Sequence, residues 1–235
     1  MAKKKKLTVA VIDTETTMRN EHSHLIFDFA FVIGNVYDNH SYDILEKNYL
    51  IKDTLKNPDA YKQFWDYCSR MGVDVITAYN LNFDLKAMQK TQAQFSDKQL
   101  RLPNGVDKVC LMDMCQTFIM NRDFKIWWDN LEDSFRSQFT TDKGNLSYSA
   151  ECLYRYLFDD YFYKEQHTAL RDCRMEYKLL KYCYSKWSPE INKHFINNIK
   201  GVSWRTANKI FSKKEKLAMR NEKRKKRANQ IQMDF

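Results

Sequence analysis

The chain has 235 residues, a formal net charge of +9 and six cysteines. This length allows one substantial core, and no apolar run approaches the ~20 residues that span a bilayer. The opening MAKKKK lacks the hydrophobic segment of a signal peptide, and the cysteines form no CxxC pair, which argues against a secreted disulfide framework or a zinc cage. The composition predicts a soluble cytoplasmic protein with reduced cysteines in its core.

The positive charge is concentrated at the two ends of the sequence. Residues 201–235 contain eleven Lys or Arg and three acids, and Lys3 to Lys6 are four consecutive lysines, so the body of the chain is mildly acidic. Basic ends can hold a polyanion near an acidic site by counterion release, or they can simply keep the protein soluble. The sequence predicts three parts: a basic tail (1–6), a main domain (7–189) and a basic C-terminal extension (190–235).

Hydrophobic periodicity predicts an α/β order of elements. Residues 7–52 alternate apolar and polar side chains around a turn-like DNHS, which predicts three strands in a meander. The elements expected after them are a helix over 59–71, a strand over 73–79, a helix over 83–95, a strand near 108–113, helical structure within the aromatic-rich 116–139, and amphipathic helices over 146–157 and 168–187. Three strands followed by alternating helices and strands predict a mixed sheet with helices on both faces.

Acidic residues stand at the end of the first predicted strand and at the start of the second helix. Side chains two apart on a strand share a face, so Asp13 and Glu15 of VIDTETT project the same way as Val9 and Val11. A further acid, Asp84, stands in AYNLNFD, after the predicted strand over 73–79. Carboxylate oxygens are the ligands that Mg²⁺ and Mn²⁺ prefer.

A histidine and an acid stand at the start of the last predicted helix. At 100° per residue, His167 and Asp172 of HTALRDC would be about 140° apart on a regular helix, so both cannot serve one site from its interior. His167 is therefore expected before the helix or at its frayed start. Asp172 begins a stripe through Met175, Leu179 and Tyr182 that faces whatever the helix packs against, and a carboxylate there is costly unless a cation meets it.

Together the three segments resemble the histidine-bearing branch of the DEDD-type 3′→5′ exonucleases, which includes the proofreading epsilon subunit of bacterial DNA polymerase III, RNase T and oligoribonuclease. The resemblance covers roughly residues 7–187, and LMDM at 111–114 resembles a further family strand that ends in Asp. Met18 replaces a usual glycine, and Tyr79-Asn80 replaces a usual His-Asn pair. The resemblance implies an RNase H-like fold.

The same resemblance implies a two-metal phosphodiesterase with Mg²⁺ or Mn²⁺ ions about 4 Å apart. Asp13 would bridge both ions, Glu15 and Asp172 would complete the nucleophile side, and Asp84 would support the second ion partly through water. His167 would act as the general base, because imidazole is neutral and available at and above neutral pH. Contacts to the terminal nucleotide are expected from four residues beside the motifs: Thr16, Thr17, Asn80 and Phe83.

The last six residues, QIQMDF, resemble the hexapeptide by which many bacterial replication proteins bind the sliding clamp. The four matching positions are Gln230, Ile231, Met233 and Phe235. Such peptides bind in an extended form through an apolar anchor, although a simple frayed end is the alternative interpretation. A bacterial-type sliding clamp or a DNA polymerase is the partner that this peptide implies.

The sequence is compatible with three functions. A replication-associated 3′→5′ DNA exonuclease, acting on single-stranded DNA or DNA 3′ ends and releasing nucleoside monophosphates, is favoured by the clamp-like peptide. A 3′→5′ RNA exonuclease of the RNase T or oligoribonuclease type would use the same residues and differ in its contacts to the 2′-hydroxyl. A non-catalytic nucleic-acid-binding module is the third, and the intact set of four acids and one histidine argues against it.

Overall fold

The computed structural model describes residues 5–17, 25–37, 42–52, 60–94, 105–141, 144, 146–186 and 195–196. Five strands form one mixed sheet in the order β3-β2-β1-β4-β5. The strands are β1 (Lys5–Thr16), β2 (Ile26–Tyr37), β3 (Tyr42–Lys52), β4 (Val75–Ala78) and β5 (Asp107–Cys110). The first three are antiparallel neighbours, whereas β4 and β5 run parallel to β1. The predicted meander, extended by parallel strands in an RNase H-like arrangement, is confirmed.

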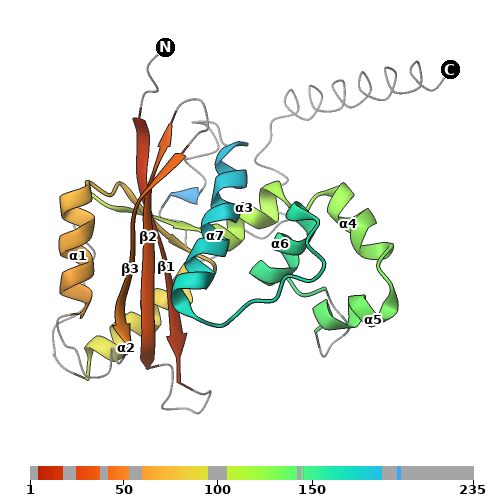
Figure 1. The fold of residues 1–235 in the computed structure, drawn as a ribbon, viewed down its shortest axis with the longest axis horizontal. Helices are drawn as coiled ribbons and strands as arrows, with labels where there is room; N and C mark the ends of the chain where they lie inside the picture. Colours follow the sequence, from red (N-terminus) through yellow and green to blue (C-terminus); the bar gives the residue numbers. More distant parts are fainter. Residues whose placement is uncertain are drawn as a thin grey trace.

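Helices cover both faces of this sheet, as predicted. They are α1 (Ala60–Met71), α2 (Leu81–Gln92), α3 (Leu111–Phe118), α4 (Arg122–Asp129), α5 (Asp133–Arg136), α6 (Ala150–Phe158) and α7 (Ala169–Tyr184). Helices α1 and α2 lie on one side of the sheet, and α7, with α3 and α6 beside it, covers the other, while α4 and α5 lie beyond α6 (Figure 1). Within the described ranges, no helix has the length and apolar character needed to cross a bilayer.

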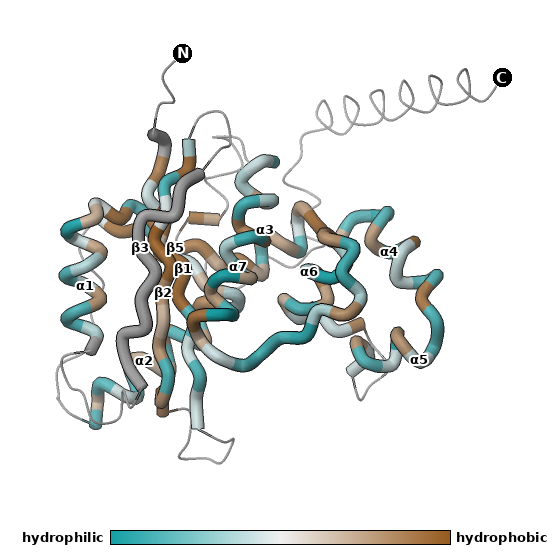
Figure 2. The backbone as a smooth tube through the Cα atoms, viewed as in Figure 1, coloured by the Kyte–Doolittle hydropathy of each residue, from teal (hydrophilic) through white to brown (hydrophobic). Residues whose placement is uncertain are grey.

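The alternation of β1 divides its side chains between two cores. Val9 and Val11 are buried in the core beneath α3, α6 and α7, and Ala10 and Ile12 are buried in the core beneath α1 and α2. Figure 2 shows hydrophobic residues along β1 and β2, between the helices on the two sides of the sheet. Because the face of Val9 and Val11 continues along the strand, β1 directs the two acids near its end toward α7.

Residues 111–114, predicted as a strand ending at Asp113, instead form the first turn of α3. The strand β5 ends at Cys110, and Asp113 is buried inside the helix. The prediction was wrong because a short apolar run does not distinguish a strand from a buried helix by its period.

Two helix boundaries also differ from the predicted ones. Leu146 does not begin α6 but forms an isolated bridge with Thr140. The helix begins after Ser149, whose hydroxyl accepts a hydrogen bond from the Cys152 amide at 3.2 Å and so caps the first turn. Helix α2 begins at Leu81, two residues earlier than predicted.

All six cysteines are buried and free, as the composition predicted.

The chain ends differ in how far the structure describes them. Lys5 and Lys6, assigned to the basic N-terminal tail, belong to β1. Phe195 of the predicted extension is buried, with its ring centroid 5.8 Å from that of Phe118, so this residue packs on the main core. Apart from Phe195 and Ile196, the extension, including the clamp-like peptide, lies outside the described residues.

Candidate metal and catalytic centre

Three of the predicted site residues meet where β1 ends and α7 begins. A carboxylate oxygen of Glu15, a carboxylate oxygen of Asp172 and an imidazole nitrogen of His167 all lie within 4.8 Å of one another. Burial, followed by the nearby negative charges of Glu165 and Glu15, raises the pKa of the Asp172 carboxyl group. Two carboxylates held this close repel each other, and a bound cation would offset that repulsion.

His167 reaches this cluster because it lies outside the helix, as the sequence predicted. Helix α7 has Thr168 as its N-cap and begins at Ala169. The φ angle of His167 is 49°, in the left-handed region, which few residues other than glycine adopt. This turn of the backbone frees His167 from the 100° spacing of the helix and lets its ring face Asp172. Residues held in such conformations cost about 1–3 kcal/mol and often occur at functional sites.

Asp13 and Asp84 lie beside the three-residue cluster rather than within it. Asp84 accepts a hydrogen bond from the hydroxyl of Thr14 at 2.8 Å, which joins α2 to the end of β1. Burial raises the pKa of Asp84 to about 7. Burial, and then the negative charges of Asp84 and Asp172, raise the pKa of Asp13 well above its usual value. The four predicted carboxylates therefore act on one another electrostatically.

The donor atoms of the cluster fit a hard divalent cation. Burial, followed by the charges of Glu165 and Glu15, raises the pKa of Asp172 to about 7. Its Oδ1 atom is buried and has no hydrogen-bond partner among the described residues. A buried polar atom without a partner is costly, and a cation would both satisfy this oxygen and offset the surrounding negative charge. Carboxylate oxygens are the ligands that Mg²⁺ and Mn²⁺ prefer.

Two acids near the cluster were missed by the sequence analysis. Glu165 is half-buried, and its negative charge raises the pKa of both Asp13 and Asp172. Glu176 is buried on the same face of α7 as Asp172, and its Oε2 accepts a hydrogen bond from the Tyr79 amide at 3.0 Å. This bond ties the turn between β4 and α2 to α7. A sequence signal existed for Glu176, because it stands four residues after Asp172 on the predicted buried stripe.

A third missed acid, Asp28, fixes the start of α7. Asp28 is directly opposite Glu15 in the pairing of β2 with β1. Its Oδ2 accepts a hydrogen bond from the Ala169 amide at 3.1 Å. Asp28 thereby satisfies one of the free amides in the first turn of α7, where the side chain of the N-cap Thr168 forms no hydrogen bond. The sequence held no signal for this contact, because the register of β1 and β2 cannot be read from their alternation.

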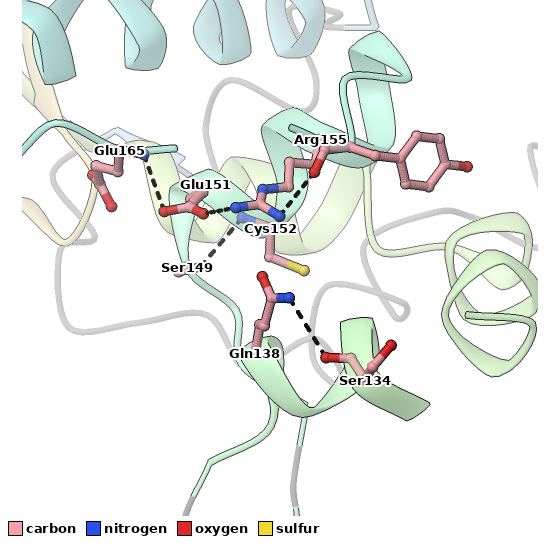
Figure 3. Close-up of polar contacts among 8 residues, drawn as sticks. Ser134, Gln138, Ser149, Glu151, Cys152, Arg155 and Glu165 are labelled. Atoms are coloured by element: carbon pink, nitrogen blue, oxygen red, sulfur yellow. Dashed lines mark hydrogen bonds and ion pairs between the residues drawn. The ribbon is translucent and has the colours of Figure 1, made fainter. Parts of the chain in front are cut away.

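A buried ion pair on α6 holds the segment that leads to His167 (Figure 3). Arg155 pairs with Glu151 one turn earlier, and its Nη1 donates to the carbonyl oxygen of Tyr161 at 3.0 Å. The other carboxylate oxygen of Glu151 accepts a hydrogen bond from the Glu165 amide at 3.1 Å. Residues 161 and 165 are thus both attached to α6, and the second attachment lies two residues before His167.

The predicted nucleotide contacts remain predictions. Thr16 and Thr17 are half-buried where β1 ends. Asn80, the N-cap of α2, is exposed with a φ of 68°, and Phe83 in the first turn is 37% exposed. Because β1 and β4 are parallel, their carboxyl ends place these residues at the same edge of the sheet as the acids. The residues of the clamp-like peptide lie outside the described ranges.

Neither a protein-family model nor a curated protein sequence matches this chain. Among solved structures, the chain is similar to the crystal structure of cell-death related nuclease 4 (CRN-4), with a TM-score of 0.41 and 14% sequence identity. The similarity covers 76% of this chain and 64% of that chain.

Proposed function

We propose that this protein is a divalent-metal-dependent 3′→5′ exonuclease that acts on single-stranded DNA or DNA 3′ ends and releases nucleoside monophosphates. The observation that carries the proposal is the meeting of Glu15, His167 and Asp172 within 4.8 Å, at a site where Asp13 and Asp84 add further negative charge. The order and spacing of the three motifs, which resemble those of the DEDD-type exonucleases, support the direction of degradation.

Each residue has a distinct role in this proposal. Asp13, Glu15, Asp84 and Asp172 would hold two Mg²⁺ or Mn²⁺ ions, which supply stabilisation of negative charge at the scissile phosphate and at the leaving 3′ oxygen. His167 is exposed, so its imidazole can reach a water molecule beside a bound phosphodiester and take its proton. Through the backbone amides that they bind, Asp28 would hold the start of α7 against β2, and Glu176 would hold the turn after β4 against α7.

The choice of DNA over RNA is supported by the C-terminal QIQMDF. A bacterial-type sliding clamp, or a DNA polymerase that works with one, is the proposed partner, because tethering to a clamp raises the local enzyme concentration without new contacts to the substrate. Calorimetry of the intact protein against such a clamp tests the partner. Removal of Met233 and Phe235 should abolish the signal, and no heat from the intact protein at tens of micromolar would contradict it.

The function is tested by incubating 5′-labelled single-stranded DNA and RNA of one sequence with Mg²⁺, Mn²⁺ or a chelator. The expected result is stepwise shortening of DNA from the 3′ end that needs metal and is lost in Asp13→Asn but not in the matched control Asp66→Asn, an exposed acid of α1. Faster shortening of RNA would replace DNA with RNA as the substrate. Metal-independent cleavage, or none with either nucleic acid, would contradict the exonuclease.

A further inference from the structure

A cavity of 200 Å³ lies between α6, the segment before His167 and α7. Its wall includes Gln166, the residue next to His167, and Arg171, the residue next to Asp172. The cavity therefore adjoins the acidic cluster but is lined by different side chains. At this volume it is smaller than the ~300–1,000 Å³ pockets that take drug-sized ligands, and it would admit a part of one nucleotide rather than a duplex.

Cations line the α7 side of this cavity. Arg171, Arg174 and Lys178 recur three and four residues apart, so they form one exposed stripe. They span about 10 Å along the helix at a rise of about 1.5 Å per residue, long enough to face more than one phosphate of a strand. Among the described residues neither arginine is engaged in an ion pair. Helix α7 thus presents carboxylates on its buried face and positive charge on its exposed face.

Two aromatic residues, Tyr154 and Tyr163, also line the cavity. Their ring centroids are 4.2 Å apart. The Nζ atom of Lys178 donates to the Tyr154 hydroxyl at 2.8 Å and lies 5.1 Å from the centroid of that ring. Cations that follow a backbone, next to rings on which bases stack, are the combination used by proteins that bind single-stranded nucleic acids.

We infer that this cavity and its stripe of cations form a groove that binds the single strand on the 5′ side of the nucleotide that is cleaved. Arg171, Arg174 and Lys178 would contact its phosphates, and Tyr163 would lie beside a base. The inference rests on the proposed function, because it assigns the groove to the substrate of that site. It places the incoming strand along the exposed face of α7 and explains how a mildly acidic body can hold a polyanion without help from its basic ends.

The first test measures binding of a 5′-fluorescein-labelled oligothymidylate of about eight nucleotides in chelator, where cleavage is blocked. Arg174→Gln/Lys178→Gln should weaken binding about tenfold at low salt and should reduce the salt slope by about 0.7 for each phosphate that the variant no longer neutralises. The matched control is Lys62→Gln/Arg70→Gln, which removes the same charge from α1 on the other side of the sheet. Arg174→Gln alone, which changes one exposed side chain, provides the same binding measurement if the double variant does not fold.

The second test separates failure of the groove from failure of the proposed function. The p-nitrophenyl ester of thymidine 5′-monophosphate reaches the cleavage site but has no second nucleotide to occupy the groove. The double variant should lose about tenfold more activity on the oligonucleotide than on this ester. Equal losses on both substrates, or a binding loss no larger than that of the α1 control, would overturn the groove. A parent protein that hydrolyses neither substrate would contradict the proposed function, while the binding measurement would still decide the groove.

Discussion

Among single residues, His167 has the most specific proposed role, that of the general base. It is exposed, an imidazole nitrogen lies within 4.8 Å of carboxylate oxygens of Glu15 and Asp172, and its φ angle is in the left-handed region. A structural histidine would be buried and hydrogen-bonded to neighbouring residues, whereas His167 is exposed beside two acids. The substitution that tests its role is His167→Asn, because asparagine tolerates a positive φ better than alanine does and so preserves the turn.

His167→Asn should lower the rate of cleavage about a hundredfold or more, as expected when a general base is lost, with a smaller effect on substrate binding. Single-turnover rates across pH 6 to 9 measure this change. The parent rate should rise with pH over the lower part of the range, and the variant should lose that rise. A variant whose pH profile matches that of the parent would assign the base to another group.

Substitution of Asp172 tests how much a buried acid at this position destabilises the metal-free protein. Asp172→Asn should abolish turnover while leaving the metal-free protein at least as stable as the parent, because the substitution removes a buried negative charge beside Glu15. Thermal unfolding in chelator, with the activity assay beside it, provides the measurement. A large drop in stability in chelator would mean that Asp172 is a structural residue whose charge is already compensated.

At the scale of elements, the ion pair on α6 determines where the segment before α7 lies. Arg155 is 6% exposed, and it joins Glu151, the Tyr161 carbonyl group and the ring of Phe139, whose centroid is 4.7 Å away. Removing one partner of a buried pair leaves the other charge uncompensated, which costs about 3–5 kcal/mol. Glu151→Gln should therefore destabilise the protein and, through the Glu165 amide, loosen the segment that ends at His167.

The expected signature of Glu151→Gln is a loss of kcat with little change in the affinity for metal, measured at a temperature where the variant is fully folded. Asp129→Asn, which removes the exposed ion pair with Lys125 on α4, is the matched control and should change stability by less than about 1 kcal/mol. If Glu151→Gln lowers only the thermal midpoint and retains the parent kcat, the pair stabilises α6 but does not position His167.

Much of this arrangement of elements could be predicted from local patterns. Alternation located β1 and the shared face of Asp13 and Glu15, and the helical angle placed His167 before α7. The contacts of Asp28 and Glu165 could not be predicted, because they depend on the register between strands and on the path of an irregular segment. The run at 111–114 was assigned to a strand because four residues are too few to show a helical period.

At the scale of the whole molecule, the buried acids make stability depend on pH and on metal. The pKa values of Asp84 and Asp172 are raised to about 7, above the value of about 3.9 expected for aspartate in the unfolded chain. Between these values the folded protein binds more protons than the unfolded one, so the metal-free protein should lose stability as pH rises from about 4 to about 7. Mg²⁺ should restore stability mainly at the higher pH, where the acids are ionised.

Urea unfolding in chelator and in Mg²⁺ at pH 5 and pH 8 measures this dependence. The free energy of unfolding in chelator should be higher at pH 5, and the gain from Mg²⁺ should be larger at pH 8. Asp84→Asn/Asp172→Asn should flatten the dependence on pH. Stability in chelator that rises with pH across this interval would mean that the carboxylates are already neutralised by groups of the protein.

We expect the acids at the end of β1 and the start of α7 to form a binding site for divalent metal. Calorimetric titration of Mn²⁺ into the parent protein and Asp13→Asn tests it most directly, because the measurement needs no substrate. The parent should bind two ions per chain and release protons at pH 6.5, where the raised pKa values leave part of the acids protonated. Asp13→Asn should bind one ion at most. Failure of the parent to bind Mn²⁺ at millimolar concentration, or equal binding by Asp13→Asn, would contradict the claim.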